Sequence, residues 1–219
     1  MARLPQIHGA LLEEIVLRLL WQAGYRQVAV GEEGTSQGPS GLEVQGRGAP
    51  HQIDALVTPI HAHSFIHTIR LIVEAKCESK AVGIDIVRNL VGTLLDLNQN
   101  FITWDTGASK LSMQRFNYHG AVFAANGYSK RAEKYALAHQ IFLIDYSNVS
   151  LMRPVIDALV SLNLGDFATG PGGEAEFSIG RLREDFDRAI SVNGDVAPGE
   201  VFVENGLVKI REATAFPAG

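Results

Sequence analysis

Three polar side chains stand in otherwise apolar segments of the sequence, and together they could perform metal-dependent chemistry. Asp54 lies within the apolar run 53–57, and Glu74 and Lys76 end the most hydrophobic run of the chain. In a strand, residues two apart share a face, so Glu74 and Lys76 are expected to point the same way. If the segment around Asp54 pairs beside this strand, two carboxylates and one ammonium meet at one edge of a sheet.

Two carboxylates at short range suit a hard divalent cation such as Mg²⁺, with Mn²⁺ as a possible substitute, because such ions prefer oxygen ligands. A water bound to the ion can attack a phosphodiester, while the ion stabilises the charge on the phosphate oxygens. Lys76 can then orient or deprotonate that water. Burial beside a cation would depress the pKa of Lys76, and the two carboxylates would oppose that shift. The pattern therefore predicts hydrolysis of phosphodiesters.

Apolar periodicity predicts the elements that position these side chains. Residues 32–40 and the polar stretch between residues 98 and 121 are expected to be a loop and a linker. The order of the remaining elements indicates an α/β sandwich around a mixed sheet. Helices are expected at 9–23, 84–98, 129–139 and 151–162, and strands at 27–30, 42–45, 52–57, 69–75, 121–125 and 141–144.

The first predicted helix carries two adjacent glutamates, and only one of them is expected to face the sheet. At about 100° per residue, Glu14 points nearly opposite the apolar stripe, into solvent, whereas Glu13 falls at the edge of that stripe. Gly24 is expected to end the helix.

Charge and composition divide the chain and limit its class. Residues 165–219 hold 10 acidic and 5 basic side chains and so carry the whole net charge of −5. A Gly-rich stretch at 164–174 indicates a boundary, so we predict a domain over 1–164 and a small acidic appendage over 165–219 with one helix and a β-hairpin. Residues 1–164 carry no net charge, so charge does not exclude nucleic acid as a partner of this domain.

The chain has 46% hydrophobic and 20% charged residues, which is typical of a globular protein with a real core. No apolar run is long enough to cross a membrane, and no export signal is recognised. The single cysteine, Cys77, excludes a disulfide framework and favours a reducing cytoplasm.

On Asp54, Glu74-Ala75-Lys76 and the following helix VGIDIVRNLVG, the sequence resembles the PD-(D/E)xK nuclease superfamily, and most closely its Mrr-like restriction endonuclease branch. The resemblance spans about residues 9–162. It implies a restriction-endonuclease-like αβββαβ core with a mixed central sheet flanked by helices, plus the small C-terminal α/β appendage. It also implies that Asp54 and Glu74 bind the metal, that Lys76 is the catalytic lysine, and that Glu13 adds to the metal site. Two departures are Ile53, where the namesake motif has Pro, and the acidic Glu74, where Mrr-like enzymes often have Gln.

The resemblance further implies an Mg²⁺-dependent endonuclease acting on DNA, in restriction of foreign DNA or in DNA repair. A catalytically silent nucleic-acid-binding or assembly module of the same fold and a structure-selective junction nuclease are the alternatives. The acidic segment 165–219 is expected to contact another domain or a second copy, to be dispensable for the chemistry, and to lie away from the catalytic edge, since DNA phosphates repel it.

Several polar residues are candidates for contacts with the substrate. Gln52 could hydrogen-bond the site or simply be a polar residue of an edge strand. Arg88, Lys130, Arg131 and Lys134 could contact phosphates or lie on solvated helix faces. A second metal site is also conceivable, because His61, His63 and His67 have a spacing that could be read as zinc ligands, although a surface loop is the favoured interpretation.

Overall fold

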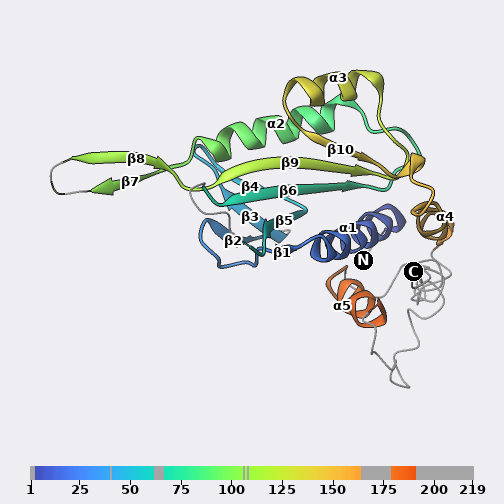
Figure 1. Ribbon diagram of the computed structural model, residues 1–219. Helices are drawn as coiled ribbons and strands as arrows, with labels where there is room; N and C mark the ends of the chain where they lie inside the picture. The colour runs from blue at the N-terminus through green and yellow to red at the C-terminus, as the bar shows by residue number, and fades with distance from the viewer. Residues whose placement is uncertain are drawn as a thin grey trace.

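The computed structural model describes residues 3–39, 41–61, 67–105, 107, 109–163 and 179–190, and its centre is a five-stranded mixed sheet (Figure 1). The first three strands pair antiparallel, and the last three pair parallel. A mixed central sheet is what the sequence predicts. Across the sheet, the strands are β1 (Tyr25–Gln27), β5 (Ala55–Pro59), β6 (Ile69–Lys76), β9 (Asn117–Ala124) and β10 (Phe142–Asp145).

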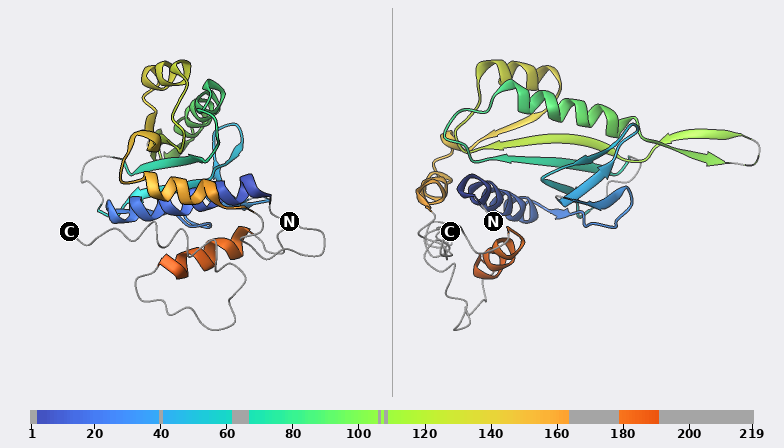
Figure 2. Two further views of the ribbon diagram at one scale, coloured as in Figure 1. Left: turned by 90° about the vertical axis from the view of Figure 1, so that its right-hand side faces the viewer. Right: turned by 180° about the vertical axis from the view of Figure 1, so that it is seen from behind.

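Helices cover both faces of the sheet, as Figures 1 and 2 show. Each face of the sheet has its own core, and alternate residues of β6 belong to different cores. Val73 packs in the core on one face, and Ile72 packs in the core on the other face. The predicted sandwich is therefore confirmed. One face carries α1 (Leu4–Gln22) and α4 (Arg153–Ser161), and the other carries α2 (Ile84–Asn98) and α3 (Lys130–Ala138).

Two of the helix ends follow local sequence rules. Gly24 follows α1 with φ of +86°, a conformation that glycine adopts without steric cost. Ser129 caps α3 by accepting a hydrogen bond from the Ala132 N–H at 3.2 Å.

A small second sheet corrects two of the sequence predictions. Its three antiparallel strands are β2 (Thr35–Gly38), β3 (Gly41–Gln45) and β4 (Pro50–Gln52), so part of the predicted loop at 32–40 is a strand. The predicted strand 52–57 is in fact the end of β4 and the start of β5, which belong to different sheets. Ile53 is buried between them, and Asp54 lies in the bend where the chain passes from the small sheet to the central one.

The polar stretch after α2 was predicted to be a linker, and this is wrong. Strands β7 (Phe101–Asp105) and β8 (Lys110–Gln114) pair antiparallel and form a hairpin that extends beyond the rest of the molecule (Figure 1). Its strands, FITWD and KLSMQ, mix apolar and polar residues, and Phe101 and Met113 are exposed, so the polar composition of the whole stretch did not identify a loop.

The acidic segment contributes a helix, α5 (Ile179–Ile190), which is confirmed as predicted. It packs on α1 (Figure 2), with Leu182 and Phe186 fully buried in the core that α1 shares with the central sheet. The predicted linker at 164–174 and hairpin at 200–211 lie outside the described residues, and the domain boundary at 164 stays a prediction. No helix in the described part of the chain is long and apolar enough to cross a membrane.

Candidate active site

The structure brings Asp54, Glu74 and Lys76 together at one end of the central sheet. Strand β5 runs antiparallel to β6 with Ala55 opposite Val73, so the bend that carries Asp54 lies beside the end of β6. The Lys76 Nζ is 2.5 Å from Glu74 Oε1 and 3.5 Å from Asp54 Oδ2. All three side chains are between 21% and 28% exposed, so the cluster is partly buried but open to solvent on one side.

The electrostatics of this cluster follow from burial and close charges. Burial raises the pKa of Glu74, and the nearby Asp54 carboxylate raises it further. Burial disfavours the charged form of Lys76, but the carboxylates of Asp54 and Glu74 outweigh burial and raise its pKa. Lys76 is therefore an ammonium ion at neutral pH. In this state it can donate hydrogen bonds but cannot accept a proton.

The oxygen atoms at this site fit a divalent cation. Asp54 Oδ2 is buried, and among the described residues its one charged contact is the long ion pair with Lys76 Nζ at 3.5 Å, which does not have hydrogen-bond geometry. A buried carboxylate oxygen with so weak a contact can accept a further cation or a proton. The described residues contain no group of three or more His, Cys, Asp or Glu side chains arranged to hold a metal ion. Mg²⁺ commonly binds through one or two carboxylates and keeps several waters, so Asp54 and Glu74 are a sufficient pair.

Glu13 of α1 lies close enough to Asp54 to be affected by its charge, but it does not join Asp54 and Glu74 in one ligand group. The Glu13 side chain is 13% exposed and forms an ion pair with Arg183 of α5. Burial raises the pKa of Glu13 to about 7, the Asp54 carboxylate adds to this, and the Arg183 and Lys76 cations oppose it. The alternation of side chains along β6 explains why Glu13 and Glu74 are separate. Ala75 packs toward α1, so the neighbouring Glu74 points to the opposite face of the sheet, which α2 and α3 cover.

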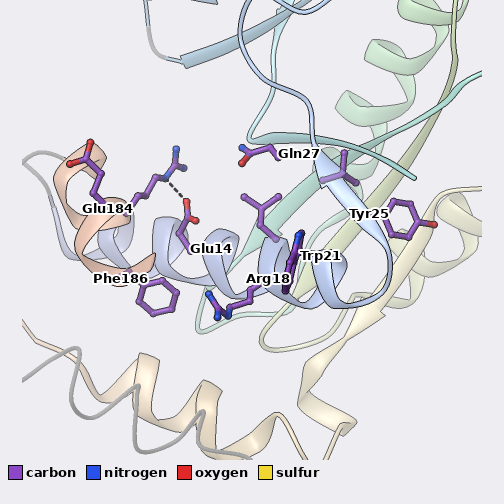
Figure 3. A pocket seen from close by; sticks show the side chains of 10 residues that line it. Glu14, Arg18, Trp21, Tyr25, Gln27, Glu184 and Phe186 are labelled. Atoms are coloured by element: carbon purple, nitrogen blue, oxygen red, sulfur yellow. Dashed lines mark ion pairs between the residues drawn. The ribbon is translucent and has the colours of Figure 1, made fainter. Parts of the chain in front are cut away.

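Glu14 was expected to point into solvent, and the structure corrects this. Its side chain is only 20% exposed, and Glu14 Oε1 lies 3.2 Å from Arg183 Nε (dashed in Figure 3). The helical wheel describes α1 alone, whereas α5 covers this side of α1 through Leu182 and Phe186. Arg183 of α5 pairs with Glu13, whose pKa the nearby Asp54 carboxylate raises. The expectation that the acidic segment lies away from the catalytic edge is therefore wrong for α5.

Arg183 is the charged residue at this site that sequence analysis missed. It stands in the segment with the most acidic composition, and no motif marks it. The available signal was the spacing of Leu182 and Phe186, which share one face of a helix and require a partner surface.

The turn before Asp54 is fastened to α2 by Asp96. The Asp96 carboxylate accepts hydrogen bonds from the N–H groups of Gly48 and Ala49 and lies 2.7 Å from His51 Nε2. These contacts anchor β4 and so fix the position from which the chain enters the bend at Asp54.

The predicted substrate-binding residues lie at the surface, and their role stays a prediction. Gln52 is exposed in β4 of the small sheet rather than in the central sheet. Arg88 lies on α2 with its guanidinium 5.7 Å from the centre of the Tyr135 ring. Lys130, Arg131 and Lys134 are exposed on the first turns of α3.

The histidine cluster receives no support in the described residues. His61 and His67 are exposed on either side of residues 62–66, and His63 lies outside the described residues. A zinc site at these histidines stays a prediction.

A mixed sheet flanked by helices, with Asp, Glu and Lys gathered at one end of adjacent strands, defines a domain of the nuclease class. The model of the restriction endonuclease family with the Mrr catalytic domain matches residues 4–152. The chain therefore belongs to the restriction endonuclease family, and the resemblance drawn from the sequence is confirmed.

Two solved structures resemble the chain at low similarity. One is the crystal structure of AF1548, a protein of unknown function, with 17% identity and a TM-score of 0.42, covering 80% of this chain and 92% of that one. The other is the MspJI restriction endonuclease in complex with a 27-mer oligonucleotide, with 16% identity and a TM-score of 0.38, covering 71% of this chain and 31% of that one. Among curated proteins, none matches the chain.

Proposed function

We propose that the protein is an Mg²⁺-dependent endonuclease that hydrolyses phosphodiester bonds in DNA and acts in the restriction of foreign DNA. The observation that carries the proposal is the contact of Lys76 with both Asp54 and Glu74, in a chain that belongs to the restriction endonuclease family. A chain that had lost its chemistry would have no need to keep an ammonium and two partly buried carboxylates together.

Asp54 and Glu74 would hold the cation, since they offer carboxylate oxygens side by side, Glu74 on β6 and Asp54 in the bend before β5. Among the described residues, the buried Asp54 Oδ2 has only the long ion pair with Lys76 at 3.5 Å. When bound, Mg²⁺ or Mn²⁺ would stabilise negative charge on the phosphate oxygens and lower the pKa of water, so that the water loses a proton more easily and becomes a better nucleophile for phosphorus. The raised pKa of Glu74 means that cation binding competes with a proton at this carboxyl. Activity should therefore fall as the pH is lowered.

Lys76 acts as a hydrogen-bond donor and as a positive charge. Without a bound cation, the raised pKa keeps Lys76 protonated at neutral pH, and in this form it can hold a phosphate oxygen or orient the attacking water. A protonated lysine has no lone pair to accept the proton that this water loses, so a second group would take it. Glu13, with a pKa of about 7 and a position near Asp54, suits this task.

DNA would approach from the open side of the cluster. Arg88 at the start of α2 and Lys130 and Arg131 at the start of α3 are candidates for phosphate contacts, because Val82 and Tyr128, just before these two helices, form a bridge and bring the two helix starts together. Gln52, two residues before Asp54, is a further candidate for a contact with substrate.

The test is cleavage of supercoiled, linear, modified and branched DNA by the full chain, with Mg²⁺, Mn²⁺ or EDTA. We expect cleavage with either cation, none in EDTA, and none for Asp54→Asn. Asp157→Asn is the matched control, because Asp157 is an exposed carboxylate of α4 that pairs with Arg153. It should cleave like the wild type.

Four results would contradict the proposal. Cleavage that persists in EDTA or in Asp54→Asn would exclude this site. DNA binding without cleavage under all conditions would favour a non-catalytic binding module, and cleavage of branched DNA alone would favour a junction nuclease.

A further inference from the structure

Helix α5 is held on the nuclease domain by apolar contacts that place one basic side chain beside α1. Leu182 and Phe186 lie one helical turn apart and are 0% and 2% exposed, within the core that α1 and β6 share. Arg183 follows Leu182 directly, and in this docked position its side chain reaches Glu13 and Glu14 of α1.

The Arg183 side chain bridges the two consecutive glutamates of α1. Its Nη2 donates a hydrogen bond to Glu13 Oε2. Its Nε lies 3.2 Å from Glu14 Oε1, the ion pair that is dashed in Figure 3, but it makes no hydrogen bond within the described part of the chain. The hydrogen bond from the planar guanidinium restricts the direction of the Glu13 carboxylate, whereas the contact of Nε with Glu14 rests on charge alone. Among the described residues, the Glu13 carboxylate makes no other hydrogen bond or ion pair. The direction of this carboxylate therefore depends on α5.

Glu13 is also the carboxylate of α1 that lies near Asp54 and Lys76. We propose that Arg183 is a positioning residue of the nuclease site, which fixes the Glu13 carboxylate beside Asp54 and so makes the C-terminal segment part of that site. The proposal rests on the proposed function, because it assumes that a divalent cation binds at Asp54 and Glu74. Without Arg183, the Glu13 carboxylate would no longer be fixed in direction beside that cation.

The experiment measures the Mg²⁺ affinity of the full chain by isothermal titration calorimetry, without DNA, together with thermal unfolding. We expect Arg183→Ala and Glu13→Gln each to weaken Mg²⁺ binding by about tenfold, as loss of an outer carboxylate or of its partner does at other metal sites. If Arg183 acts through Glu13, the double variant binds Mg²⁺ no more weakly than either single variant. Arg183→Lys keeps the charge but not the fork, and it should recover part of the affinity.

Glu14→Gln is the matched control, since it removes the other partner of Arg183 on the same helix. It should leave the Mg²⁺ affinity within about twofold of the wild type, because it leaves the hydrogen bond from Arg183 to Glu13 in place. If Arg183→Ala does not fold, Arg183→Lys and Glu13→Gln decide the question.

An Arg183→Ala protein that binds Mg²⁺ as tightly as the wild type, or more tightly, would overturn the inference, and so would additive losses in the double variant. These outcomes are distinct from failure of the proposed function. That failure would appear as a wild type that binds no Mg²⁺, or as an Asp54→Asn variant that binds it normally.

Discussion

Replacing Glu13 by Gln should change how the stability of the protein depends on pH. Burial raises the pKa of Glu13 to about 7 in the folded protein, whereas an unfolded glutamate has the ordinary value of 4.5. A group with a raised pKa in the folded state contributes stability that is fully present below the unfolded value and is lost as the pH rises to the folded value. The Glu13 contribution should thus disappear between about pH 4.5 and about pH 7.

The difference of about 2.5 pKa units corresponds to roughly 3 kcal/mol of unfolding free energy, at about 1.36 kcal/mol per unit. The Glu13 side chain is only 13% exposed, so solvent screening does not remove most of this effect. Relative to Glu13→Gln, which cannot ionise, the wild type should lose about this much between pH 4.5 and pH 7 and nothing more above pH 8.

The measurement is urea unfolding of the wild type and Glu13→Gln at half-unit steps from pH 4 to pH 8.5, in EDTA to exclude metal binding. Because both proteins share every other titrating group, the difference between their unfolding free energies isolates Glu13. Glu14→Gln, which keeps Glu13, should follow the wild type in shape. A difference that stays constant with pH would refute the reasoning, since it would mean that Arg183 and Lys76 fully offset burial and Asp54.

Three further tests probe the site and its support. Lys76→Ala should lower DNA cleavage by at least about 100-fold, as loss of a positioned hydrogen-bond donor does, and should keep Mg²⁺ binding in calorimetry; an active variant would exclude Lys76 from the mechanism. Leu182→Ala should lower the unfolding free energy by about 3 kcal/mol, because this side chain is fully buried, whereas Glu184→Ala, at an exposed position, should change it by less than about 0.5 kcal/mol. Truncation after Asn163 should destabilise the protein for the same reason, and a truncated protein as stable as the full chain would show that α5 is not part of the core.

Two elements with strong apolar periodicity could be predicted from the sequence nearly to the residue, whereas α1 begins five residues before its predicted start at Gly9. Helix α2 occupies the predicted residues, and β6 exceeds its prediction by one residue, because a strand buried on both faces leaves a continuous apolar run. Elements with little burial could not be predicted in this way. Strand β2 is polar, and the hairpin of β7 and β8 exposes even apolar residues such as Phe101 and Met113, so backbone pairing rather than burial defines these elements.

The residues of the candidate site also fall into two groups, those that local sequence patterns predict and those that only distant contacts place. Glu74 and Lys76 were predictable as neighbours, because strand geometry sets the relation of residues two apart. Asp54 was predicted beside them for a partly wrong reason, since it lies in a bend between two sheets rather than within a strand. Its place depends on contacts distant in sequence, such as Asp96 with the turn at Gly48 and Ala49, and no local pattern encodes those contacts.

The position of α5 shows why net charge was a poor guide to where the acidic segment lies. Repulsion between exposed like charges in salt solution is worth less than about 1 kcal/mol per pair, because solvent and ions screen it. Burying a Leu or a Phe side chain stabilises by roughly 1.5–3 kcal/mol each, so Leu182 and Phe186 together outweigh several such repulsions. Apolar burial therefore decides where the helix docks, and the charge of the side chain that pairs with Glu13 and Glu14 decides its electrostatic effect there. That side chain is Arg183, so the most acidic part of the chain brings a positive charge to the carboxylates of α1.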